Sequence, residues 1–127
     1  GRSASRWQQP ATRCTDTRNR TERAMKPAKE SEKDVEKYVE AYAGNLEGLA
    51  CKFTSPQRRS VPDRLIVLPG NCIFFIECKS EGEEASTAQK REHERLRRRG
   101  AFVYVCDTQR AVRDAFDDFK YHHPGVG

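Results

Sequence analysis

The chain has no long apolar stretch. Its two most hydrophobic runs, at 65–68 and 73–76, are four residues each, whereas about 20 consecutive apolar residues are needed to cross a bilayer. The first 30 residues also lack the apolar segment of roughly 7 to 15 residues that a secretory signal requires. The sequence therefore predicts a protein that does not associate with a membrane.

Cysteine pairs at metal-binding spacing are also missing. The five cysteines, an odd number, include no Cys-x-x-Cys pair, and three of them lie in apolar strand-like runs, where a thiol packs as a small hydrophobe. This usage argues against a zinc ribbon and favours a reducing, cytoplasmic compartment. The histidines have no metal-ligand companion at suitable spacing either, so His93, His122 and His123 are interpreted as ordinary surface residues.

An excess of positive charge is absent from most of the chain, although the net charge is +5. Residues 1–30 hold eight Lys/Arg against three Asp/Glu, and residues 31–127 hold sixteen of each, so the excess lies entirely in the first 30 residues. Bulk charge is therefore weak evidence for nucleic-acid binding. A local basic cluster at 90–99 either forms a solvated helix surface with i, i+4 pairs or binds a DNA backbone.

The composition divides the chain into three parts. Residues 1–30 mix Arg, Thr, Ser, Gln and Pro without an apolar period, which predicts a disordered basic tail. Because Met25 is the only methionine, residues 1–24 are alternatively interpreted as an upstream extension. The rest suits one domain, placed at 31–120, and residues 121–127 are expected to form a flexible C-terminal end.

Seven segments have regular apolar patterning and predict an α/β fold of order α-β-β-β-α-β-α. Two capping boxes, Ser31 to Asp34 and Ser86 to Gln89, begin the first two helices. The expected helices are 31–44, 86–99 and 108–120, and the expected strands are 49–53, 65–68, 73–79 and 101–106. The middle strands form a hairpin, and the helical crossover to the last strand implies parallel pairing. Because both hairpin strands are apolar on both faces, we expect the sheet to be covered on both sides.

Two carboxylates and a lysine occupy adjoining ends of the hairpin strands. Asp63 precedes the first strand, whereas Glu77 and Lys79 end the second, where residues two apart point to the same face. The hairpin brings Asp63 level with Glu77, so the two carboxylates can meet. Carboxylates are the hard oxygen ligands that Mg²⁺ takes, and a lysine can position a water or stabilise developing negative charge. These residues predict a metal-dependent nuclease.

Five blocks in order resemble the VRR-NUC branch of the PD-(D/E)XK nuclease superfamily. They are Lys52-Phe53-x-Ser-Pro, Arg59-Ser-Val-Pro-Asp-Arg-Leu, Phe75-Ile-Glu-Cys-Lys, Gln89-x-x-Glu-His-Glu-Arg-Leu and Val103-Tyr-Val. The resemblance implies a restriction-endonuclease-like α-β-β-β-α-β core and an endodeoxyribonuclease that uses Mg²⁺ or Mn²⁺. It also implies a small stand-alone phage or bacterial protein that acts as a homodimer on branched or junction DNA, in replication, repair or phage DNA processing.

The resemblance assigns roles to single residues. Asp63 and Glu77 would be metal ligands together with the main-chain carbonyl of Cys78, and Lys79 would be the catalytic lysine. Glu36 matches the acid of the first helix that completes the metal site, although Glu32 and Glu40 lie one turn away on the same face, with Glu32 as the next candidate. Gln89 matches the glutamine that opens the second helix, yet its place in a capping box also explains it completely.

Basic residues near the acids are expected to contact nucleic acid, because guanidinium groups can clamp phosphates; their alternative role is loop solubility. The predicted nucleic-acid-binding residues are Arg58, Arg59, Arg64, Lys90, Arg91, Arg95 and Arg98. The chain departs from the family pattern after Lys79, where Glu81, Glu83 and Glu84 replace neutral or basic residues. Two other functions stay open: a catalytically silent DNA-binding or assembly module, and an RNA-directed nuclease, since metal and carboxylates attack either backbone.

Overall fold

The seven expected segments are all present in the computed structural model, which describes residues 28–125. Each boundary lies within two residues of its predicted position. The elements are α3 (Glu32–Asn45), β1 (Leu49–Lys52), β2 (Arg64–Leu68), β3 (Cys72–Cys78), α4 (Thr87–Arg98), β4 (Val103–Cys106) and α5 (Gln109–His122). The predicted tail up to residue 27 and the last two residues of the predicted C-terminal end lie outside the described residues.

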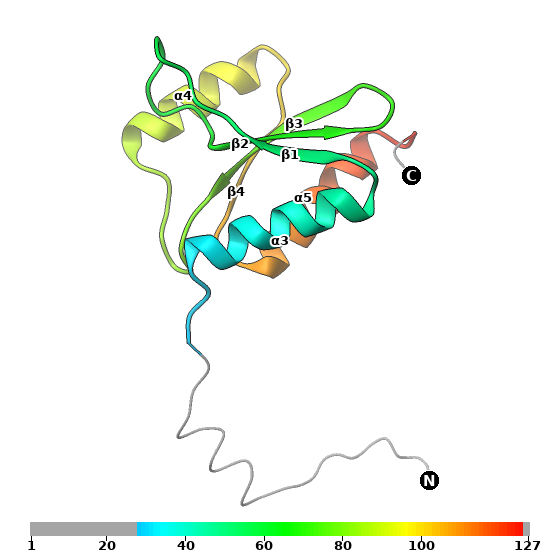
Figure 1. The fold of residues 1–127 in the computed structure, drawn as a ribbon. Coiled ribbons are helices and arrows are strands. Elements are labelled where there is room, and N and C mark those ends of the chain that lie inside the picture. Colours follow the sequence, from blue (N-terminus) through cyan, green and yellow to red (C-terminus); the bar gives the residue numbers. More distant parts are fainter. Residues whose placement is uncertain (1–27, 126–127) are drawn as a thin grey trace, which may run out of the picture.

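The four strands form one mixed sheet in the order β1-β2-β3-β4 (Figure 1). β1 pairs with β2 and β2 with β3 in antiparallel directions, whereas β3 and β4 are parallel. The β2–β3 hairpin turns through Gly70 and Asn71, whose φ angles of 89° and 62° suit these two residue types. These features confirm the predicted fold class and the parallel crossover.

Both predicted capping boxes are formed. The Ser31 hydroxyl accepts from the Asp34 N–H at 3.1 Å, and the Ser86 hydroxyl accepts from the Gln89 N–H at 3.1 Å. α5 continues two residues beyond its expected end at 120. The reason is local, because the ring of His123 stacks on Phe119 with centroids 4.0 Å apart and its Nδ1 lies 2.9 Å from the Phe119 carbonyl oxygen. Residues 121 and 122 are therefore helical.

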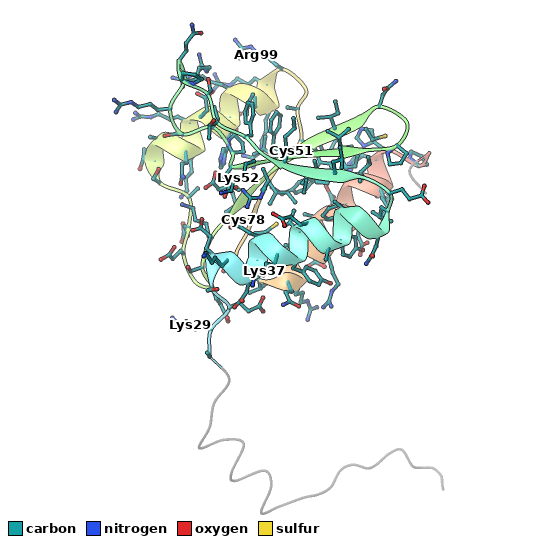
Figure 2. The ribbon with its side chains drawn as sticks, viewed as in Figure 1. Lys29, Lys37, Cys51, Lys52, Cys78 and Arg99 are labelled. Atoms are coloured by element: carbon teal, nitrogen blue, oxygen red, sulfur yellow. The ribbon has the colours of Figure 1, made fainter. Side chains whose placement is uncertain are left out.

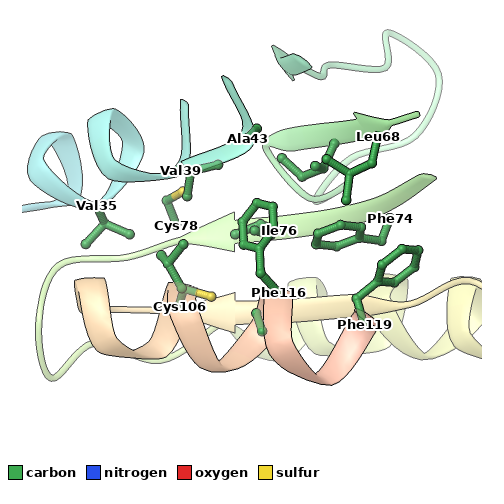
Figure 3. Close-up of a cluster of buried hydrophobic side chains, with 13 residues drawn as sticks. Val35, Val39, Ala43, Leu68, Phe74, Ile76, Cys78, Cys106, Phe116 and Phe119 are labelled. Atoms are coloured by element: carbon green, nitrogen blue, oxygen red, sulfur yellow. The ribbon is translucent and has the colours of Figure 1, made fainter. Parts of the chain in front are cut away.

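The main core lies between one face of the sheet and the helices α3 and α5 (Figures 1 and 3). Alternate residues of each strand point to this face, as the pleat requires. Fully buried side chains include Val39 of α3, Ile66 of β2, Phe74 of β3 and Phe116 of α5. The Phe74 ring meets Phe116 edge-on at 5.2 Å between centroids. This packing fixes α3 against the sheet, and α3 supplies the acidic side chains described below.

The opposite face of the sheet is only partly covered, which corrects the expectation of cover on both sides. α4 lies over the β4 side of this face (Figure 1). Leu49, Val67 and Ile73 are cross-strand partners and so share the face away from the core. Leu49 is 64% exposed and Ile73 is 52% exposed. Apolar pattern alone could not show this, because α4 is too short to cover the whole sheet.

Candidate active site

Asp63 lies at the start of β2, directly beside the end of β3. The preceding Pro62 is buried, and the Asp63 carbonyl accepts from the Phe53 N–H at 3.0 Å. Its carboxylate Oδ1 accepts from the main-chain N–H of Cys78 at 3.0 Å. The Cys78 side chain points into the core (Figures 2 and 3), fully buried, where burial raises the pKa of its thiol. The hairpin thus brings Asp63 to the β3 terminus as expected.

The carboxyl group of Asp63 holds its proton more tightly than an ordinary aspartate. Burial raises its pKa to about 6, and the negative charges of Glu77 and Glu36 add to the shift. The Cys78 N–H and the Arg64 guanidinium act in the opposite direction. Carboxylates crowded in this way repel one another, and a positive charge among them would favour their ionised forms.

A pH-dependent stability difference follows from this raised pKa. The folded protein binds the Asp63 proton more tightly than the unfolded chain, whose carboxyl has the ordinary pKa of 3.8. The resulting stabilisation is complete below that value and is lost as pH rises through about 6. In EDTA, the stability of the wild type relative to Asp63→Asn should therefore fall between pH 4 and 6.5, measured by urea denaturation. The exposed Asp117→Asn is the control; an equal profile for both variants would contradict the prediction.

Glu77 is the last residue but one of β3 and is buried, 5% exposed. Its Oε2 accepts from the Gln89 side-chain Nε2 at 3.1 Å and lies 3.8 Å from the Lys79 Nζ. The Gln89 Oε1 accepts from the Ser86 N–H at 2.8 Å. Gln89 therefore caps α4 and also donates a hydrogen bond to Glu77.

Two acids of α3 face Asp63. One carboxylate oxygen each from Glu32, Glu36 and Asp63 lies within 4.8 Å of the others. Burial and a hydrogen bond with Glu36 raise the pKa of Glu32. The i, i+4 spacing puts both glutamates on the helix face toward the sheet. Glu36, the first choice from sequence, and Glu32, the next candidate, therefore both lie beside Asp63.

Arg64 is buried beside the acids and is not exposed to a nucleic acid, which corrects its predicted role as a DNA contact. Its side chain is 3% exposed, and Nη2 lies 3.2 Å from Glu36 Oε1 and 3.7 Å from Glu40 Oε2. Nη1 donates to the main-chain carbonyl of Asp63 at 3.2 Å. The cause is strand alternation: Arg64 shares the inward face with Ile66. Glu40, the other sequence alternative on α3, pairs with Arg64 at the edge of the acidic group.

The chain is similar to known proteins in both sequence and fold. No family model matches the chain. It is 46% identical over 78 residues to "Putative nuclease p44" of Acyrthosiphon pisum secondary endosymbiont phage 1, across 61% of this chain and 84% of that protein. A solved structure described as "VRR_NUC domain" superimposes with a TM-score of 0.65 and 36% identity, over 69% of this chain and 96% of that one. The chain belongs to the VRR-NUC family. Within residues 28–125, no helix of this VRR-NUC protein is long and apolar enough to span a bilayer.

Arginines of the loop before β2 and of α4 surround a hollow of about 470 Å³ beside the VRR-NUC core. Glu92, only 4% exposed, accepts two hydrogen bonds from Arg58, at 2.7 and 2.9 Å, and one from Arg95 at 3.0 Å. The Arg58 bonds lower the pKa of Glu92 to about 2. Arg59 and Arg91 also line the hollow. Glu92 therefore holds Arg58 and Arg95, which are two of the four arginines that line the hollow.

The other predicted basic contacts are on the solvated side of α4. Lys90 Nζ lies 3.2 Å from Glu84 Oε1, and Arg98 Nε lies 3.6 Å from Glu94 Oε2. Both pairs are exposed, with side chains 53% to 81% accessible, so they contribute little to stability. Both residues lie on a charged, solvated helix surface and are accessible to a ligand, so their predicted DNA contact stays a prediction.

His93 is buried, which corrects its interpretation as a surface residue. It is 1% exposed, and its Nε2 lies 3.7 Å from Glu77 Oε1. His93 follows Gln89 by one helical turn, so both side chains point from α4 toward β3. The four-residue spacing from Gln89 could have predicted that His93 faces β3, but the charged residues around it in the sequence favoured an exposed position.

The residues of this VRR-NUC site fit a divalent cation. Hard carboxylate oxygens gather at one point, and the described residues contain three buried side-chain polar atoms without a hydrogen-bond partner. They are Arg64 Nε, Glu77 Oε1 and His93 Nε2. An unpaired buried carboxylate oxygen is costly, and Mg²⁺ or Mn²⁺ prefers such oxygen ligands. The site therefore suits the metal that the sequence predicted.

Proposed function

We propose that this VRR-NUC protein is a metal-dependent endonuclease that hydrolyses DNA phosphodiester bonds, with a preference for branched DNA. The observation that supports this most is the meeting of Asp63, Glu77 and Lys79 at the adjoining ends of β2 and β3. In addition, Glu36 and Glu32 of α3 bring their carboxylates to that of Asp63.

Each residue has a proposed role. Asp63, Glu77, the Cys78 main-chain carbonyl and Glu36, with Glu32 beside it, would hold Mg²⁺ or Mn²⁺. The bound ion supplies Lewis-acid polarisation of a phosphoryl oxygen and a lowered pKa for water. Lys79, whose side chain is 16% exposed, orients the attacking water or stabilises negative charge in the transition state. Gln89 positions Glu77 through its 3.1 Å hydrogen bond.

A cleavage panel tests this function. Four-way junction, flap, duplex and single-stranded DNA, with a matching RNA strand, are incubated with the protein in Mg²⁺, in Mn²⁺ and in EDTA. We expect metal-dependent cleavage, fastest on the branched substrates, and none in EDTA. Binding without cleavage would favour a silent DNA-binding module, and cleavage of RNA alone would favour the RNA-directed alternative.

The arginine-lined hollow is proposed to bind the DNA backbone. Arg58, Arg59, Arg91 and Arg95 outnumber the single acid Glu92 there. Arg91→Ala should weaken binding severalfold and reduce the slope of log affinity against log salt concentration by about 1, since one phosphate contact is lost. The control is Arg113→Ala on α5, on the other side of the sheet. Fluorescence anisotropy measures both; an unchanged salt slope for Arg91→Ala would contradict a phosphate contact.

A homodimer is proposed for the acting protein, with the uncovered sheet face as its interface. Leu49 and Ile73 provide exposed apolar surface on that face, and a two-fold dimer needs one self-complementary patch. Ile73→Asp should convert the dimer to a monomer in light scattering. Tyr121→Asp, at another exposed apolar side chain, 81% accessible on α5, should not. A monomeric wild type, both free and with junction DNA, would exclude the dimer.

The broader setting rests on the family resemblance. A role in replication, repair or phage DNA processing and a cytoplasmic location are proposed, together with the domain boundaries 31–120. Glu30 bears on the first boundary. Its N–H donates to Glu81 Oε1 at 2.9 Å, and its own Oε1 accepts from the Gln109 N–H at 2.7 Å. These bonds tie Glu30, two residues before α3, to the loop after β3 and to the N-terminus of α5.

A further inference from the structure

Glu77 and His93 are both buried, and one polar atom of each faces the other without forming a hydrogen bond. The Glu77 Oε1 and His93 Nε2 atoms are 3.7 Å apart, with side chains 6% and 1% exposed. Neither atom has a hydrogen-bond partner among the described residues. Burying an unpaired donor opposite an unpaired acceptor is unfavourable unless the two interact in a working state of the site.

The two oxygens of Glu77 are held unequally. Oε2 has Gln89 Nε2 at 3.1 Å and Lys79 Nζ at 3.8 Å, whereas Oε1 has no hydrogen-bond partner among the described residues and lies 3.7 Å from His93 Nε2. The terminal torsion of a glutamate is soft. Donors on one oxygen alone therefore leave the carboxylate free to rotate, and a second donor on Oε1 would fix its plane.

His93 is well placed to act as that second donor. It lies on α4 one turn after Gln89, so the same helix supplies a donor to each oxygen. Beyond Glu77, His93 lines a hollow of about 510 Å³ between α4 and β4, and a smaller side chain would leave a void there. An ionised carboxylate oxygen has two lone pairs, so Oε1 can accept from His93 and still face a cation.

We propose that His93 is a positioning residue for the metal ligand Glu77. In the metal-loaded site its Nε2–H donates a hydrogen bond to Glu77 Oε1, and the carboxylate is held between donors of α4 on both oxygens. This inference rests on the proposed metal-dependent function. Outer groups that orient a ligand typically change metal affinity by about 10- to 100-fold when removed.

The test measures Mn²⁺ affinity by isothermal titration of the full chain. His93→Leu, of similar size but without a donor, should raise the Kd by about 10- to 100-fold. His93→Gln, whose amide nitrogen reaches near the Nε2 position, should restore most of the affinity. His93→Asn, whose amide nitrogen reaches only the Nδ1 position, should not. The exposed His122→Leu on α5 is the matched control and should bind as the wild type.

The Gln and Asn variants separate positioning from packing. Both are polar and lack the imidazole ring, but only the Gln amide nitrogen reaches near the Nε2 position. Thermal melting in EDTA verifies that each variant folds. Wild-type affinity in His93→Leu, or equal affinities of the Gln and Asn variants, would overturn the inference. A wild type that does not bind Mn²⁺, or Asp63→Asn that binds it equally well, would overturn the proposed function itself. The two failures are therefore distinguishable.

Discussion

Glu77→Gln is expected to reduce DNA cleavage by on the order of 10³-fold while leaving the fold intact. The substitution keeps the shape of the side chain and removes its charge. The neutral amide is a poor metal ligand. In either orientation its NH₂ group would face a proposed donor, Gln89 and Lys79 on one side or His93 on the other. Metal binding and the orientation of the site should both suffer, and cleavage should show the combined loss.

The same substitution should stabilise the metal-free protein. The charge of Glu77 helps to raise the pKa of Asp63, so its removal relieves repulsion among the carboxylates. Cleavage rates in Mg²⁺ and melting temperatures in EDTA should therefore move in opposite directions. Glu94→Gln, an exposed acid of the same helix that carries Gln89, is the control for both measurements. Wild-type cleavage by Glu77→Gln would remove this residue from the mechanism.

Arg64→Met is expected to lower the stability of the metal-free protein by about 2 to 3 kcal/mol, somewhat less than the loss typical of a fully buried pair. Arg64 is 3% exposed, and its partner Glu36 is 21% exposed. The substitution leaves Glu36 and Asp63 together without a neighbouring guanidinium. For a domain of this size the melting temperature should fall by roughly 10 to 20 °C.

Divalent metal should reduce that deficit, because a bound cation takes over the neutralisation of the same carboxylates. The decisive measurement is the difference in melting temperature between wild type and Arg64→Met, in EDTA and in saturating Mn²⁺. Arg113→Met on the exposed side of α5 makes the same change without a buried partner and should be nearly silent. A deficit for Arg64→Met that is unchanged by Mn²⁺ would argue against a shared cation site.

The strand half of the site could be predicted from sequence because it depends on short-range rules. Asp63 and Glu77 are 14 positions apart in the sequence, joined by one hairpin whose register follows from its turn. Pairing of Arg64 with Ile76 then puts Asp63 level with Glu77. The two capping boxes were equally local, so both helix starts were placed within one residue.

The side chains that were misplaced depend on tertiary packing. Arg64 and His93 look like solvent-exposed charges in sequence, and each is buried only because a second element, α3 for Arg64 and β3 for His93, lies against it. Alternation with Ile66 and Leu68 did contain a signal for Arg64. Buried arginines are rare and occur mainly where a carboxylate neutralises them, so alternation alone does not predict a buried Arg64.

The open sheet face depended on the length of α4. Its 12 residues span about 18 Å at 1.5 Å per residue, which covers the β4 side and leaves Leu49 and Ile73 exposed. β2 and β3 are apolar on both faces, as their sequence predicts. What the pattern could not tell is whether this chain or another one covers the second face.

The tight β2–β3 turn also has a kinetic consequence. A hairpin of this kind closes on the order of 1–10 μs, ahead of pairings that join more distant parts of the chain. Asp63 and Glu77 are therefore expected to come together in an early folding event, whereas Glu32 and Glu36 arrive only when α3 docks. During synthesis the strand-borne half of the acidic group would be assembled before α4 and β4 are complete.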